Sequence, residues 1–176
     1  LIENIREAIS ENSHIKIWNL SLGTNKEADS AEFSDFGKAL DEIQEEYDVL
    51  ICKSAGNCTN FKNNTPRSRI AQSADTVRGL VVGSIAKSKN TLDLSEKNHS
   101  SPFSRIGPGP SFLIKPDIAH VGGNAGLDEN NALVLNPVFT FAKTGERKGV
   151  VGTSFSTPRI SSILSGIDNL LSGDFN

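Results

Sequence analysis

The chain has 176 residues, which is enough for one domain with a hydrophobic core and short for two. Hydrophobic residues make up 36% and charged residues 22%, as in globular proteins, and the net charge of -3 gives no reason to expect a nucleic-acid partner. No apolar run approaches the roughly 18 residues of a membrane-spanning helix, so we expect no membrane partner either.

The first half of the chain alternates between helix and strand patterns. Residues 1–12 and 31–47 carry apolar side chains at helical spacing, and each range predicts an amphipathic helix. Residues 15–22, 49–54 and 77–84 predict strands, the first of them buried around Trp18. Apolar strands separated by a helix predict an α/β fold: three layers, with a mostly parallel sheet and helices on both faces.

The second half of the chain differs from the first in composition. Prolines and glycines in residues 90–131 predict an ordered but irregular region. Residues 134–141 predict a strand that Pro137 interrupts, and residues 144–148 predict a turn. Residues 154–171 predict a final helix with one apolar face. We expect Pro158 to fall within the first turn or so of this helix, where backbone N–H groups lack partners anyway.

Ser154 lies where the Gly-Thr turn at residues 152–153 meets the start of that helix. A helix N-terminus presents unpaired N–H groups and the positive end of the helix dipole, which suits a nucleophile whose reaction produces an oxyanion. Serine is equally a favoured N-cap residue, and this segment taken alone favours the N-cap interpretation. Other segments must therefore decide between the two.

Two such segments end predicted strands at the carboxyl edge of the sheet, where parallel sheets bind ligands. The second strand ends in Ser-Ala-Gly-Asn at residues 54–57, and the amide of Asn57 can donate to a developing oxyanion. The first strand ends in Asn-Leu-Ser-Leu-Gly at residues 19–23, where Gly23 lets another backbone approach closely. In isolation, one is an ordinary Gly-Asn turn and the other a routine strand ending.

Taken together and in this order, the segments resemble the subtilase family of serine proteases. Its catalytic domain carries an Asn-x-Ser-x-Gly strand, an Ala-Gly-Asn segment and a Gly-Thr-Ser-x-x-x-Pro segment, which match residues 19–23, 55–57 and 152–158. Lesser matches are Val-Val-Gly-Ser, Phe-Ser-Arg-Ile-Gly-Pro and Lys-Pro-Asp-Ile-Ala, at residues 81–84, 103–108 and 115–119. The resemblance implies a partial subtilisin-like fold in which residues 1–176 form a single incomplete catalytic domain, its C-terminal portion.

The resemblance also implies a role for each segment. Ser154 would attack the scissile carbonyl of a peptide or protein substrate, and Asn57 with the Ser154 N–H would form the oxyanion hole. An extended substrate would pair with residues 21–23 through backbone hydrogen bonds. The pocket for the residue before the cleaved bond would be walled by Ser21, Leu22, Gly23, Ser54, Ala55 and Gly56.

The triad base and acid are missing from the chain. A serine hydroxyl needs a base and a group that orients the base, and subtilases carry their Asp and His segments upstream of the Asn-x-Ser-x-Gly strand. The predicted strand begins at Ile15, which leaves no room for either segment. His14, His99 and His120 do not lie in a matching stretch. We therefore expect this chain to be inactive alone and to need the N-terminal half of its catalytic domain as a partner.

Two alternatives come from other classes. A pseudoprotease or peptide-binding module would keep the peptide groove without the chemistry, but the intact Ser154 and Asn57 argue against it. Sedolisins, which are acid serine peptidases, also carry a Gly-Thr-Ser segment. They place Asp at the oxyanion position, where this chain has Asn57.

Other expectations concern ligands, partners and location. Cys52 in a strand and Cys58 in a loop predict no disulfide, which fits a cytoplasmic bacterial protein, with a secreted one as the alternative. The residues themselves show no metal site. The resemblance raises Ca²⁺ as a ligand, but residues 128–131 are better interpreted as a solvated loop. Without its N-terminal half, the chain should dimerise or rearrange at the exposed face.

Overall fold

The computed structural model describes residues 1–173. The N-terminal half runs α1 (Ile2–Glu11), β1 (Ile17–Leu20), α2 (Asp35–Tyr47), β2 (Leu50–Ser54), the 3₁₀ turns Asn60–Asn63 and Gln72–Ala74, and β3 (Leu80–Ile85). A 3₁₀ turn at Pro110–Phe112, β4 (Ile118–Val121), β5 (Asn124–Leu127), β6 (Leu133–Asn136), β7 (Val138–Phe141), β8 (Arg147–Val150) and α3 (Thr153–Gly173) follow.

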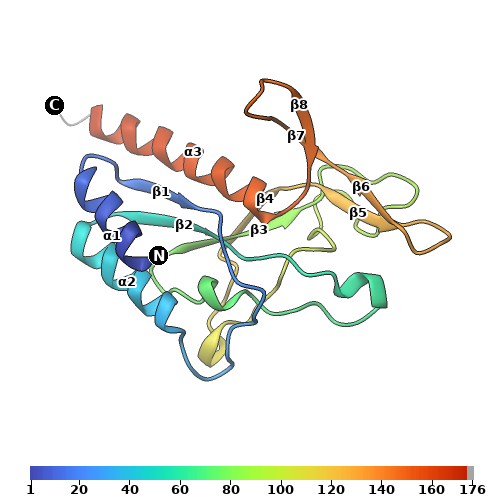
Figure 1. Cartoon of the computed structure of the whole chain (residues 1–176), viewed down its shortest axis with the longest axis horizontal. Helices are drawn as coiled ribbons and strands as arrows, with labels where there is room; N and C mark the ends of the chain where they lie inside the picture. The colour runs from blue at the N-terminus through green and yellow to red at the C-terminus, as the bar shows by residue number, and fades with distance from the viewer. Residues whose placement is uncertain (174–176) are drawn as a thin grey trace.

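The centre of the molecule is a parallel sheet of β1 to β4, in that spatial order. Trp18 lies opposite Ile51, and Lys53 lies opposite Val81. Helices α1 and α2 cover one face of the sheet and α3 runs along the other (Figure 1). The expected three-layer α/β fold is therefore confirmed. The carboxyl ends of β1 and β2 carry residues 21–23 and 54–57 to one rim of the sheet.

Strand β2 shows why both faces need a helix. Its successive side chains point to opposite faces, because a strand alternates with a period of two. Ile51 packs with Ile9, Leu40 and Ile43 beneath α1 and α2, while Cys52 packs on the other face with Val82 and Ile160 of α3. Burying a large aliphatic side chain contributes about 1.5–3 kcal/mol, so these clusters hold the layers together.

Several expectations need correction. The region expected to be irregular contains β4 and β5. Each of these strands has only four residues, which is too short to show the alternation of apolar and polar side chains. The expected turn at residues 144–148 closes a hairpin, β7 with β8, and a second hairpin joins β5 to β6. Trp18 is half-buried: it packs against the cluster of Ile9, Leu40, Ile43 and Ile51 and lines the groove between α1 and β1.

Pro158 was placed in the first turn of the last helix, and that prediction was wrong. Helix α3 begins at Thr153, so Pro158 lies in its second turn. A proline there has no N–H for the carbonyl four residues earlier, which belongs to Ser154. The helix nevertheless continues to Gly173. One position earlier, Ser156 and Thr157 donate their hydroxyls to the Thr153 carbonyl, at 2.9 and 2.7 Å.

Both cysteines are free, and Cys52 is buried in β2 as expected, while Cys58 in the following loop is buried as well. Burial raises the pKa of the Cys52 thiol to about 11, because the thiolate would lose its hydration in the core. In residues 1–173, no helix combines the length and the apolar character that a membrane span requires.

Candidate active site

Ser154 is the second residue of α3, at the rim where β1 and β2 end. Its hydroxyl is half-buried and donates to the Ser21 carbonyl at 3.1 Å. Its backbone N–H belongs to the first helical turn and bonds to no acceptor within residues 1–173. The structure therefore brings the predicted nucleophile to the predicted substrate segment, with a free N–H beside it.

Asn57 is held against the start of α3 by its side-chain oxygen. Asn57 Oδ1 accepts from the Thr153 N–H at 3.0 Å and from the Thr153 hydroxyl at 3.3 Å. The amide group has one acceptor and one NH₂ donor, so these contacts fix which end of it points away from the helix. Asn57 Nδ2 is exposed and donates to nothing in the described part of the chain. It is available to a ligand in front of Ser154.

Gly152 makes this approach sterically feasible. It has a φ of +140°, and a Cβ at that position would lie 3.3 Å from Asn57 Nδ2. Glycine tolerates such a φ, while a side chain would press on the amide. Two donors without an acceptor in the described residues, the Asn57 NH₂ and the Ser154 N–H, thus lie at the start of α3. That arrangement can stabilise negative charge on an oxygen bound there.

The six predicted pocket residues also gather at this rim. Ser21, Leu22 and Gly23 follow β1, and Ser54 ends β2, with Ala55 and Gly56 next. The Ser54 hydroxyl donates to the Leu22 carbonyl at 3.4 Å, and the Ala55 N–H donates to the Val82 carbonyl at 3.0 Å. The two strand endings therefore lie side by side, with Ser154 bonded to one of them.

Sequence reasoning missed two buried cations behind this pocket. The Lys53 ammonium donates to the Leu22 carbonyl, and to the Ser54 carbonyl at 3.1 Å, while its side chain is completely buried. Burial lowers the pKa of Lys53 to about 8, and the nearby Asp75 carboxylate opposes that shift. Arg105 is 4% exposed and donates to the Asn57 carbonyl at 3.0 Å. A lysine inside an apolar strand pattern was the available signal.

None of the three histidines bonds to Ser154 in the described residues. His14 and His99 are exposed, and His120 is on β4, where its Nδ1 accepts from the Val121 N–H at 2.8 Å. Asp117 is paired with Lys115 at 2.8 Å and accepts from the Val81 N–H, which is a structural role in the sheet. The proton acceptor that a serine nucleophile needs does not come from these groups.

Residues 128–131, considered for calcium, lie in the turn between β5 and β6. Asp128 Oδ1 accepts from the N–H groups of Asn130 and Ala132, both at 2.8 Å, so this carboxylate oxygen closes that turn. Within residues 1–173, no three His, Cys, Asp or Glu side chains are grouped as they would be around a metal ion.

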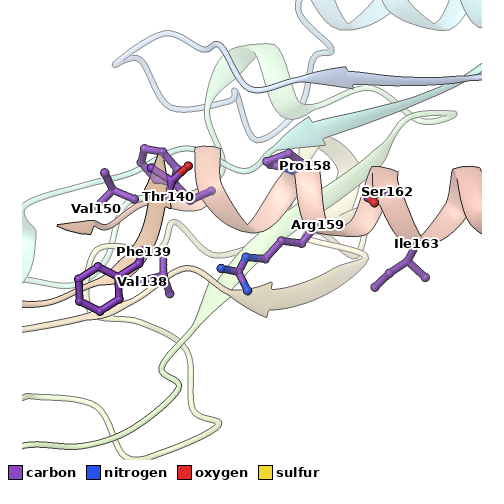
Figure 2. Close-up of a pocket in the computed structure, with 9 residues that line it drawn as sticks. Val138, Phe139, Thr140, Val150, Pro158, Arg159, Ser162 and Ile163 are labelled. Atoms are coloured by element: carbon purple, nitrogen blue, oxygen red, sulfur yellow. The ribbon is translucent and has the colours of Figure 1, made fainter. Parts of the chain in front are cut away.

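Apolar surface lies exposed along α3 and between α1 and β1. A groove of about 400 Å³ runs along α3 between Phe155, Pro158 and Ile163 on one wall and the β7–β8 hairpin on the other (Figure 2). A second groove of about 240 Å³ separates α1 from β1. Further along α3, four large apolar side chains are about half exposed or more: Ile163, Ile167, Leu170 and Leu171.

Comparison with known proteins finds a family model and a curated relative that match this chain. The family model described as "Subtilase family" matches residues 1–170. Among curated proteins, the uncharacterized protein y4bN of Sinorhizobium fredii (strain NBRC 101917 / NGR234) is 29% identical over 203 aligned positions, which cover 89% of this chain and 45% of that protein.

The similar solved structures are proteases. The prenylagaramide maturation protease PagA has a TM-score of 0.65 at 18% identity, with 99% of this chain and 52% of that chain covered. The patellamide maturation protease PatA has a TM-score of 0.62 at 20% identity, covering 98% and 51%. A cold-adapted subtilisin-like serine proteinase has a TM-score of 0.56 at 17% identity, covering 94% and 47%. At these identities the likeness shows the fold, and the chain spans about half the length of each.

Proposed function

Because this chain belongs to the subtilase family, we propose that it is the C-terminal part of the catalytic domain of a serine endopeptidase, with Ser154 as the nucleophile. Residues 1–176 would then be a single incomplete domain. The oxyanion donors and the pocket walls would lie in this chain. The base and the acid of the triad would come from an N-terminal half, since the matched structures are about twice as long.

The observation that carries this proposal is the contact between Asn57 and Thr153. Asn57 lies on the segment after β2 and Thr153 starts α3, yet Asn57 Oδ1 accepts two hydrogen bonds from Thr153. These bonds hold the Asn57 NH₂ towards the space in front of Ser154. A serine that acted only as an N-cap would gain nothing from an exposed amide fixed in that orientation.

In the proposed reaction, Ser154 Oγ forms a bond to the carbonyl carbon of the substrate and its proton passes to the base of the N-terminal half. The carbonyl oxygen becomes an oxyanion and accepts from Asn57 Nδ2 and the Ser154 N–H. As the C–N bond breaks, the leaving amine takes the proton from the base and an ester remains on Ser154. Water, activated by the same base, then hydrolyses the ester.

The Ser154 hydroxyl would have to leave its present partner for this step. In the structure it donates to the Ser21 carbonyl at 3.1 Å, and Ser21 belongs to the segment along which an extended substrate would pair. A base on the other side of Ser154 would have to take over this hydrogen bond before attack. We therefore expect the hydroxyl of the isolated chain to be a weak nucleophile.

The N-terminal half would dock along the open edge of β1. In the described residues β1 pairs with β2 alone, one groove lies between α1 and β1, and exposed apolar side chains lie along α3. Unpaired strand edges and exposed apolar side chains promote association. The chain alone should therefore form a dimer through this face or rearrange there, and a monomer that unfolds in one sharp transition would contradict this expectation.

The test compares the whole protein that contains this chain with residues 1–176 alone. The whole protein should hydrolyse a fluorogenic peptide and react with a fluorophosphonate serine probe, and the chain alone should do neither. Ser154→Ala in the whole protein should lower turnover by a factor on the order of 10⁶ and abolish labelling. Ser165→Ala, on the same helix, exposed and outside the groove beside α3, is the matched control. A whole protein that binds peptides without hydrolysing them would favour the peptide-binding module instead.

A further inference from the structure

A buried guanidinium lies where the proposed pocket segments converge. Arg105 donates from Nε to the Asn57 carbonyl at 3.0 Å, from Nη1 to the Arg69 carbonyl at 3.1 Å and from Nη2 to the Asn25 carbonyl at 2.7 Å. Asn25 follows one pocket wall, residues 21–23, and Asn57 follows the other, residues 54–56. A group bonded to both ties the two wall segments to each other.

Gly56 lets the arginine lie directly beneath one wall. Its φ is +97°, and a Cβ at this position would lie 2.9 Å from Arg105 Cδ and 3.3 Å from Nε. The Arg105 N–H also donates to the Gly56 carbonyl at 3.1 Å. The main chain of Arg105 therefore bonds to Gly56, and its side chain bonds to Asn57, the next residue.

In the described part of the chain, Arg105 has no acidic partner, unlike its neighbour Arg69. Arg69 pairs with Glu27 at 3.7 Å. Arg105 forms no ion pair within residues 1–173, and carbonyl oxygens take only three of the five guanidinium N–H groups. A buried charge without a counter-charge is unfavourable, so the pocket has an unmet preference for an anion.

A buried hydroxyl group beside the other wall, residues 21–23, also lacks a hydrogen-bond partner among the described residues. The Ser73 hydroxyl is 2% exposed and has no hydrogen-bond partner in the described chain. It lies 3.3 Å from the position that a Gly23 Cβ would take, and the Lys53 ammonium lies 3.7 Å from the same point. Buried hydroxyl groups are almost always paired, so an orphan beside the pocket points to a polar ligand.

We propose that this pocket accepts an acidic side chain, Asp or Glu, from the substrate residue before the cleaved bond, and that Arg105 determines this specificity. The inference rests on the proposed function, because it takes residues 21–23 and 54–56 as the pocket walls. A planar guanidinium matches a carboxylate in bidentate geometry, and the pairing is strong where water is excluded. A lysine side chain in the same pocket would meet a like charge.

The first test uses the whole protein and four peptides that differ only in the residue before the cleaved bond: Glu, Gln, Leu or Lys. We expect kcat/KM for the Glu peptide to exceed that for the Gln peptide at least tenfold, with the Lys peptide cleaved most slowly. Arg105→Met should bring the Glu-to-Gln ratio close to one, and Arg105→Lys should restore part of it. Arg78→Met is the matched control, because Arg78 pairs with Glu45 on the surface, and it should leave the ratio unchanged.

Two results would overturn the proposal. One is equal cleavage of the Glu and Leu peptides by the unmodified protein. The other is a uniform loss over all four peptides in Arg105→Met, which would make Arg105 a structural clamp on Asn57. A second measurement covers failure of the proposed function itself: binding of the Glu and Gln peptides to the Ser154→Ala whole protein. Tighter binding of the Glu peptide would support the inference without turnover, and equal binding would reject it.

Discussion

Polar groups from distant segments are paired with one another at the carboxyl rim of the sheet, whereas apolar side chains face solvent along α3. At the rim, Asn57 bonds to Thr153, Ser154 bonds to Ser21, and Lys53 bonds to Leu22. Along α3, Leu170 is 71% exposed and Ile163 is 50% exposed. The rim has the paired polar groups of a site, and the exposed face of α3 has the apolar character of an interface. Substitutions at the rim should therefore lower catalytic activity, whereas substitutions of the exposed apolar residues should weaken association with a partner.

The largest expected effect is on stability, where a buried leucine and an exposed leucine should differ. Leu40 is completely buried under α2, so Leu40→Ala should lower the free energy of unfolding by about 2–5 kcal/mol through lost burial and a residual cavity. Leu170→Ala, the same change on the exposed face of α3, should alter it by no more than about 0.5 kcal/mol in a monomeric state. Urea denaturation of both variants measures the difference. A large loss at Leu170 would mean that a second copy already covers the α3 face.

The next contrast is within the rim. Asn57→Ala in the whole protein should reduce kcat by about 10²–10³ with little change in KM, because the amide would bond to the oxyanion and not to the ground-state carbonyl. Steady-state kinetics on a fluorogenic peptide measures both constants. Asn90→Ala, in a loop away from the rim, is the control. An equal fall in the Asn90 variant, or a rise in KM alone for Asn57→Ala, would contradict the assigned role.

The buried charges at the rim predict a pH dependence. The pKa of Lys53 is lowered from 10.5 to about 8, so above pH 8 the unfolded chain binds a proton that the folded chain has released, and stability rises with pH. The pKa of Cys52 is raised from 9.0 to about 11, so above pH 9 its contribution falls with pH. The free energy of unfolding should therefore rise by about 1 kcal/mol from pH 8 to 9 and then level off.

Two variants separate these contributions in urea denaturation at a series of pH values. Lys53→Met should remove the rise between pH 8 and 9, since no amine then titrates in the core. Cys52→Val should let the rise continue above pH 9. If Lys53→Met kept the same slope as the unmodified chain, the rise would have to come from another group.

The smallest effect expected at the rim concerns Thr153. Its hydroxyl lies 3.3 Å from Asn57 Oδ1, while its N–H, which a substitution retains, lies at 3.0 Å. Thr153→Ala should therefore lower kcat less than tenfold, because the backbone bond still holds the amide. The measurement is kcat of Thr153→Ala beside Asn57→Ala. If the two variants lost activity equally, the hydroxyl and not the backbone would position Asn57.

Much of the fold could be predicted from local pattern. Apolar residues at helical spacing predicted α1, α2 and α3 within a few residues, and the apolar runs around Ile51 and Val82 predicted parallel strands. The strand expected at residues 134–141, interrupted by Pro137, is observed as β6 and β7. Strands β4, β5 and β8 and the hairpin pairings were missed, because a four-residue strand has too few residues to show alternation. Helix α3 begins one residue before the expected start, and Pro158, expected within its first turn or so, lies in its second turn.

The sequence by itself determined the layered α/β architecture and, through its short motifs, the choice of Ser154 and Asn57 as the residues to examine. Only the tertiary structure decided which end of the Asn57 amide faces outward, because that orientation depends on Thr153, 96 positions away. It also decided that Lys53 and Arg105 are buried behind the same pocket. Hydrophobic periodicity is a local property that a sequence displays, whereas the burial and pairing of a charge depend on segments that meet only after folding.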